Sequence, residues 1–184
     1  NYKIKLIVGE EEFIRELEVV KDPNSEASLE ELTEQVAFSL QLRDAMNLAV
    51  TMINDIETIR AELNEIIPKL ERTSDFKKSE ELRKVAETIV ASLYDIQLTG
   101  AREDAFRSPM KLYGRLSALA SDIGGYGADF KPTDQQREVY AIFNKRLKDV
   151  DIKFKKFINV DIKKLNVQLK KSELLIKNNK KIKS

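Results

Sequence analysis

After an opening stretch of alternating residues, the chain changes to the spacing of amphipathic helices. The opening, "YKIKLIVGEEEFIRELEVVKDP", places apolar residues at even spacing on both sides of a Gly9-Glu10 turn: Tyr2, Ile4, Leu6, Val8, Phe13, Leu17 and Val19. Alternation with period two predicts a β-hairpin, which Pro23 ends because proline cannot donate to a strand ladder. A lone hairpin is marginally stable in water. We therefore expect its apolar faces to be partly exposed, or covered by a neighbouring copy.

A long first helix is predicted from Ser28 to about Leu70. Ser28 and Glu31 form a capping box, in which each side chain bonds the backbone of the other residue. Beyond it the apolar residues alternate by four and three, except where Arg60 takes one position: Leu42, Met46, Ala49, Ile53, Ile56, Leu63, Ile67 and Leu70. This heptad-like seam predicts a rod of roughly 60 Å that packs against partners of similar length.

Two further helices follow in the pattern. The second is expected to begin near Ser74 or Ser79 and to run to about Leu98, with its seam at Leu82, Val85, Ala86, Ile89, Val90, Leu93 and Ile96. The third is expected to begin at Ser108-Pro109, an N-cap followed by proline, and to end at Gly124-Gly125. Its seam is Leu112, Leu116, Leu119 and Ile123.

The fourth helix is predicted from a second capping box, Thr133 with Gln136. Its expected core positions are Val139, Ile142, Phe143, Leu147, Val150, Phe154 and Phe157. "INVD" at 158–161 then predicts a break, with Asp161 capping a short last helix through Leu165 and Leu169. A Lys/Asn-rich tail follows, in which Leu174, Leu175 and Ile176 are apolar enough to dock.

Together these elements predict a mainly α fold. It is an up-and-down bundle of about four long helices plus a short fifth, preceded by a β-hairpin. The predicted divisions are a hairpin at 1–23, a helical bundle at 24–172 and a basic tail at 173–184.

Composition excludes much chemistry. The chain has no cysteine and no histidine, so disulfides, thiolate nucleophiles, Cys/His zinc sites and Ser-His pairs are all impossible. No apolar run approaches the length of a transmembrane helix. Apolar residues at 42% and charged residues at 34% suit amphipathic helices better than a sheet buried on both faces.

Charge is uneven along the chain although the net charge is only +1. Residues 1–71 carry 7 basic and 16 acidic residues, whereas 145–184 carry 14 basic and 4 acidic residues. The favoured interpretation is that the basic C-terminal helices lie beside the acidic first helix. The alternative is an anionic partner, such as nucleic acid or acidic lipid.

Four stretches contain residue types that occur in functional sites, but none of them predicts a site. "DIGGYGADF" (122–130) follows a helix rather than a strand, so it indicates a helix end and not a phosphate loop. "GAREDAFRSP" (100–109) holds loop charges, Arg102, Glu103, Asp104 and Arg107, at no fixed separation. The carboxylates Glu30, Glu31, Glu34, Glu62 and Glu65 lie on one helix without histidine, which disfavours a metal site. In the Lys-rich segment 145–184, Phe154 and Phe157 suit a core better than a base-stacking surface, which disfavours nucleic acid as a partner. We therefore predict no catalytic, cofactor-binding or metal-binding residue.

The opening stretch resembles the last two strands of an immunoglobulin-like module. It is similar to the part that joins such a module to a helical C-terminal region in large bacterial sortilin-like, BNR (Asp-box) β-propeller proteins, often labelled glycosyl hydrolase or exo-sialidase-like. "LQLRDAMN" (40–47), "LTGAREDAFRSPMKLYGRLSAL" (98–119), "PTDQQREVY" (132–140) and "NVDIKKLN" (159–166) resemble the helices of that region. The resemblance implies that any glycan or peptide site lies in an upstream propeller, and that the parent protein is exported.

The function expected from this reasoning is a non-catalytic structural or protein-interaction module of a larger exported protein. Its expected partners are upstream domains of the same polypeptide, with self-association through the hairpin as a further possibility. Two alternatives stay open. One is a free-standing bundle that binds an anionic partner through its basic C-terminal third. The other is a glycosidase that uses carboxylates such as Glu103 and Asp104, which would require a cleft with two carboxyl groups about 5–10 Å apart.

Overall fold

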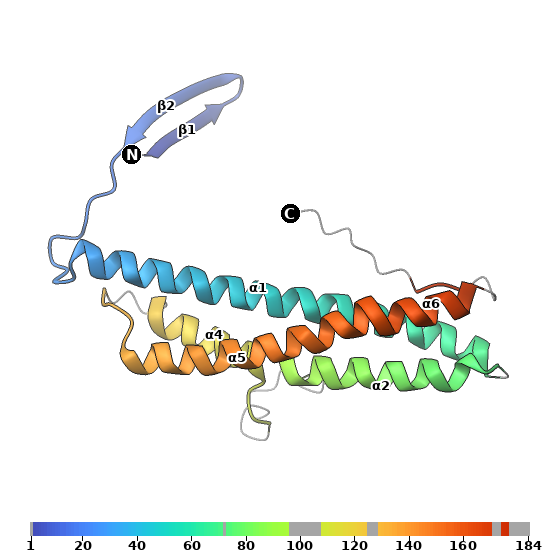
Figure 1. Cartoon of the computed structure of the whole chain (residues 1–184). Helices are drawn as coiled ribbons and strands as arrows, with labels where there is room; N and C mark the ends of the chain where they lie inside the picture. Colours follow the sequence, from blue (N-terminus) through green and yellow to red (C-terminus); the bar gives the residue numbers. More distant parts are fainter. Residues whose placement is uncertain (1, 72, 96–107, 125–128, 171–173, 177–184) are drawn as a thin grey trace.

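The fold is a helical body with a separate N-terminal hairpin (Figure 1). In this computed structural model, residues 2–71, 73–95, 108–124, 129–170 and 174–176 are described. Within these ranges, four helices and a short fifth follow a two-stranded antiparallel sheet, which confirms the predicted fold class.

The hairpin comprises β1 (Tyr2–Val8) and β2 (Glu11–Leu17). The two-residue turn lies at Gly9-Glu10 as predicted, and Gly9 adopts φ +62°, a conformation that favours glycine. Every residue of both strands is exposed, and neither strand contacts any of the described helices. The expectation of exposed apolar faces is therefore confirmed.

The first helix, α1 (Leu29–Ile66), begins at the predicted capping box. The Glu31 backbone N–H donates to the Ser28 hydroxyl at 3.1 Å, and the Ser28 N–H donates to the Glu31 carboxylate at 2.9 Å. The helix tightens into the 3₁₀ turn η1 (Ile67–Leu70), since Pro68 has no N–H to continue the α-helical bonding.

The second helix, α2 (Asp75–Leu93), begins near Ser74 as expected, but it ends five residues before the predicted Leu98. Tyr94 is already extended, with φ −142° and ψ 147°. The third helix, α4 (Leu112–Gly124), ends at Gly124 as predicted but begins three residues after Pro109. The predicted Ser108-Pro109 start is thus wrong, and Lys111 supplies the first carbonyl, which accepts from Arg115 N–H at 3.1 Å.

The fourth helix, α5 (Asp134–Lys156), has the predicted capping box, with Gln136 N–H donating to the Thr133 hydroxyl at 3.2 Å. The predicted break at 158–161 is wrong. The chain widens into a π-helical segment, η2 (Phe157–Ile162), and continues directly into α6 (Lys163–Leu169). Asp161 lies inside η2 and caps nothing. Because π-helical bonds join residues five apart, Phe157 and Ile162 fall on one face, and both are buried.

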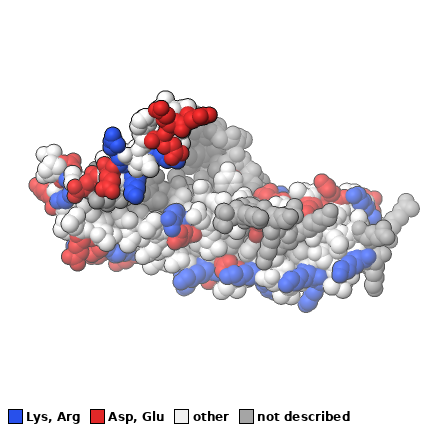
Figure 2. Space-filling model, turned by 90° about the horizontal axis from the view of Figure 1, so that it is seen from above, with Lys and Arg blue, Asp and Glu red and all other residues white. Residues whose placement is uncertain are grey.

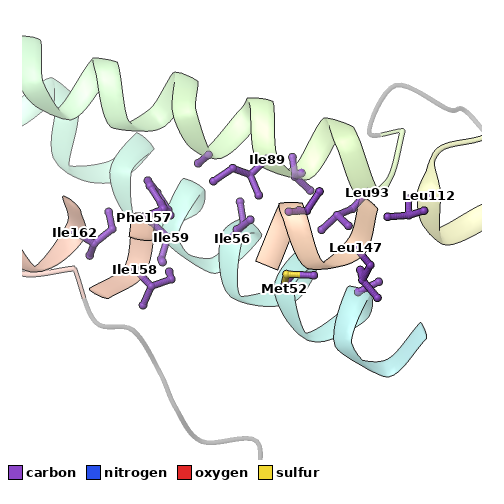
Figure 3. Close-up of a cluster of buried hydrophobic side chains, with 14 of the residues drawn as sticks. Met52, Ile56, Ile59, Ile89, Leu93, Leu112, Leu147, Phe157, Ile158 and Ile162 are labelled. Carbon is purple, nitrogen blue, oxygen red and sulfur yellow. The ribbon is translucent and has the colours of Figure 1, made fainter. Parts of the chain in front are cut away.

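Helix α1 is the central helix of the body. It packs against α2 and α4, which lie end to end along it, and against α5 (Figure 1). Side chains from these helices and from η2 meet in one continuous core, and Figure 3 shows its centre, with Ile56 and Ile59 of α1 near Ile89 of α2 and Phe157 of η2. Near the α4 end of the same cluster lie Met52, Leu93, Leu112 and Leu147.

The pattern of buried residues differs from the predicted seams at several positions. Val85, Val139 and Ile142, expected in the core, are exposed. On α1 the buried stripe is wider than one seam and also takes in Phe38, Ala45, Met52, Ile59 and Ile66. The end of the chain docks in part, because Ile176 is buried and its backbone exchanges two hydrogen bonds with the Asn166 side chain, at 2.9 and 3.0 Å.

Candidate functional site

One face of the hairpin is exposed and mainly apolar. Antiparallel pairing sets Tyr2 opposite Leu17 and Leu6 opposite Phe13, so that their side chains share this face with Ile4 and Val8. The partners of Ile4 and Val8 are the charged residues Arg15 and Glu11, which lie on the same face. Leu6 is 58% exposed, Ile4 53% and Phe13 45%. We call these six side chains the hairpin face: Tyr2, Ile4, Leu6, Val8, Phe13 and Leu17.

The opposite face of the hairpin is mainly charged. Lys3 pairs with Glu16 across the strands, and the Lys5 ammonium lies 2.5 Å from the Glu12 carboxylate. Ile7 and Ile14 are the apolar residues on this side. A sheet with one mainly apolar and one mainly charged face is suited to being covered on one side only, as in a β-sandwich.

The acidic residues at the start of α1 make structural contacts. The Ser28 backbone and side-chain hydrogen bonds hold the pKa of Glu31 below its ordinary value, and Lys131 and Lys21 add smaller effects. Glu34 forms an ion pair with Arg137 of α5 at 2.7 Å. The second acidic pair, Glu62 and Glu65, lies about 45 Å further along α1 by helical rise, so the two groups share no site.

The basic C-terminal segment lies partly beside α1, as expected, but is not neutralised by it. Helix α5 packs on α1, whereas α6 packs on α2 and η2. Among the described residues of 145–176, the ion pair formed is Lys155 with Asp151 at 2.5 Å, within α5 itself. Figure 2 shows basic side chains in a row along one long edge of the body, while acidic side chains gather near the hairpin end. Phe157 is buried and Phe154 half-buried, so neither forms an exposed stacking platform.

A charge network ties α1 to α2. Arg60 of α1 contacts Glu57 at 2.5 Å and Glu87 of α2 at 3.9 Å, and Arg83 of α2 bonds both Glu87 at 2.8 Å and Glu80 at 3.0 Å. Side-chain hydrogen bonding to Glu80 raises the pKa of Arg83. Glu87 also lines a polar cleft of about 600 Å³ with Asp95 and Ser108. Its carboxylate is committed to the ion pairs between the helices, which is a structural role.

A second cleft lies where α2, α4 and α5 meet. It has a volume of about 380 Å³, and we call it the junction cleft, lined by Ser92, Pro109, Met110, Lys111, Leu112, Arg115, Arg146, Asp149 and Val150. No sequence motif marks it, because its charged residues come from separate helices and no local spacing links them. Sequence reasoning therefore missed it.

The remaining predicted positions are placed as follows. Gly124 ends α4, and 125–128 of the glycine-rich stretch lie outside the described residues. Arg102, Glu103, Asp104 and Arg107 also lie outside them, so the glycosidase alternative is untested. Within the described ranges, no group of three or more Asp or Glu side chains is placed to hold a metal ion. None of the described helices has both the length and the apolarity needed to cross a membrane.

Comparison with known proteins does not assign the chain to a family. No family model matches the chain, and neither a curated protein nor a solved structure matches it significantly.

Proposed function

We propose that this chain is a non-catalytic interaction module, in which the hairpin adds two strands to a β-sandwich in the upstream part of the same exported polypeptide. The observation that carries the proposal is the hairpin face, which is apolar, exposed and untouched by any described helix. An uncovered face of this kind on a two-stranded sheet is marginally stable alone, so a covering partner is needed.

The two faces of the hairpin favour further strands as that partner. The apolar face suits the interior of a sandwich, while the Lys5–Glu12 pair suits its solvent side. Both strands also have a free edge, since β1 and β2 are the only strands of the sheet among the described residues. The helical body, with its own core, then serves as the rigid part of the module.

Hydrogen exchange tests the proposal. Backbone amides of 2–17 are followed in this chain alone and in a longer chain that includes the segment its gene encodes ahead of Asn1. We expect little protection in the chain alone and an increase of about a hundredfold or more in the longer chain. Strong protection of 2–17 in the monomeric chain alone would refute the proposal, because the hairpin would then be covered by its own helices. Protection that rises with protein concentration would instead indicate self-association.

A second function is favoured by one specific observation, the row of lysines on α5 and α6 that no described residue of another element neutralises. Such a row would bind an anionic surface through counterion release. Binding to acidic lipid vesicles or to nucleic acid would then weaken steeply with salt. Weak binding without that salt dependence would exclude this role.

A further inference from the structure

We propose that the junction cleft binds a small organic phosphate through Lys111, Arg115 and Arg146. This inference is independent of the hairpin, which touches no helix in the part of the chain that the structure describes. It rests on the charge, the free hydrogen-bonding groups and the apolar floor of the cleft.

Charge is the first argument. Three cationic side chains and one carboxylate, Asp149, line the cleft, which leaves a surplus of two positive charges. Although Arg146 and Asp149 are three residues apart on α5 and line the same cleft, no ion pair joins them in the structure. A phosphate monoester carries close to two negative charges at neutral pH and matches this surplus.

Free donors are the second argument. The Arg115 Nε–H donates to the Met110 carbonyl at 2.8 Å, which fixes the guanidinium and leaves both Nη groups without a partner among the described residues. Within the same part of the chain, Lys111 and Arg146 form no hydrogen bond or ion pair. Guanidinium groups match phosphate oxygens in pairs, and charge-assisted bonds of this type are the strongest that side chains form.

The floor is the third argument. Leu112 and Val150 are 6% and 8% exposed, so the cleft ends on core side chains. A volume of about 380 Å³ exceeds what inorganic phosphate fills and lies in the range of small-molecule sites. The ligand is therefore expected to carry a compact apolar body beside its phosphate.

The test is titration calorimetry on the full chain with phenyl phosphate as probe. Saturable binding is expected, with weaker binding of inorganic phosphate and none of phenol. Arg146→Gln should weaken phenyl phosphate binding about tenfold or more, since a charge-assisted contact is lost. Asp149→Asn should tighten binding severalfold because it removes the one repelling charge.

Lys148→Gln is the matched control. Lys148 is exposed on the same helix, does not line the cleft, and its substitution changes net charge by the same amount as Arg146→Gln. The affinity of Lys148→Gln for phenyl phosphate should stay within about twofold of that of the parent protein. Equal loss in Lys148→Gln and Arg146→Gln would overturn the proposal in favour of diffuse attraction to the basic edge. The proposal would also be overturned if binding fails to saturate by about 10 mM phenyl phosphate, because the binding free energy would then be smaller than about 3 kcal/mol. Since Arg146 is exposed, its variant should fold normally, which circular dichroism checks.

Discussion

Replacing Ser79 by alanine is expected to stabilise the protein. Ser79 lies inside α2, is fully buried, and its hydroxyl has no hydrogen-bond partner among the described residues. Leaving a buried hydroxyl unpaired costs about 1–3 kcal/mol. Alanine also has the higher helix propensity, by about 0.5 kcal/mol. Loss of one oxygen atom leaves a small gap that offsets part of this gain, so we expect a net rise of about 1–2 kcal/mol in the free energy of unfolding.

The same substitution at Ser92 is the control. Ser92 is on the same helix, but its hydroxyl donates to the Ile89 carbonyl at 2.6 Å. Ser92→Ala therefore gains the same propensity and loses a hydrogen bond, so its expected effect is near zero. The difference between the two variants isolates the cost of the unpaired hydroxyl.

Urea unfolding followed by far-UV circular dichroism measures both variants. For a chain of this length, Ser79→Ala should also raise Tm by about 2–4 °C per kcal/mol. The reasoning is refuted if Ser79→Ala is less stable than the parent or no more stable than Ser92→Ala. That result would mean that the Ser79 hydroxyl is hydrogen-bonded to a group other than the described residues, such as a buried water.

Three further outcomes are expected. Phe157→Ala should lower the free energy of unfolding, measured with urea, by about 3–5 kcal/mol, because the ring lies in the core and is 1% exposed. Ile152 is 66% exposed, so Ile152→Ala should change the same free energy by under about 0.5 kcal/mol. Because the pKa of Glu31 is lowered in the folded state, its stabilising effect is present above the ordinary value of 4.5 and is lost as pH falls through the lowered pKa. Glu31→Gln should remove that pH dependence in unfolding measured across this acid range, while Gln136 shows that glutamine still completes such a cap. Leu6→Lys should leave the cooperative unfolding of the helices unchanged within about 0.5 kcal/mol, and a larger loss would show that the hairpin does pack on them.

Features encoded within a few residues were predictable from the sequence. The two capping boxes depend on pairs three residues apart, Ser28 with Glu31 and Thr133 with Gln136, and both form as predicted. The hairpin turn at Gly9 is equally local. Each of these elements satisfies its own backbone groups, so its position does not depend on the rest of the fold.

Features set by tertiary contacts were not predictable. The sequence predicts a single apolar stripe on α1, but α1 has partners on two sides, and Ala45, Met52 and Ile59 are buried as well. On α5, Val139 and Ile142 have apolar side chains at helical spacing, but no described element covers them. The position of the junction cleft depends on where α2 ends. The sequence predicts this end at about Leu98, whereas the helix ends five residues earlier, at Leu93. The segment 158–161 predicts a break with Asp161 as the cap of the next helix, whereas burial of Phe157 and Ile162 sustains a widened helix.

The core and the hairpin differ in what holds them together, and this difference bears on function. The helical body buries large side chains such as Leu42, Leu63 and Leu116 without help from β1 or β2. The hairpin has backbone pairing and the Lys5–Glu12 contact, but it buries no apolar side chain. Any partner that covers the hairpin face stabilises the ordered hairpin over its frayed states by mass action. Conversely, a change that frays the hairpin, such as Gly9→Val at φ +62°, must weaken partner binding by the same free energy while the helices stay folded.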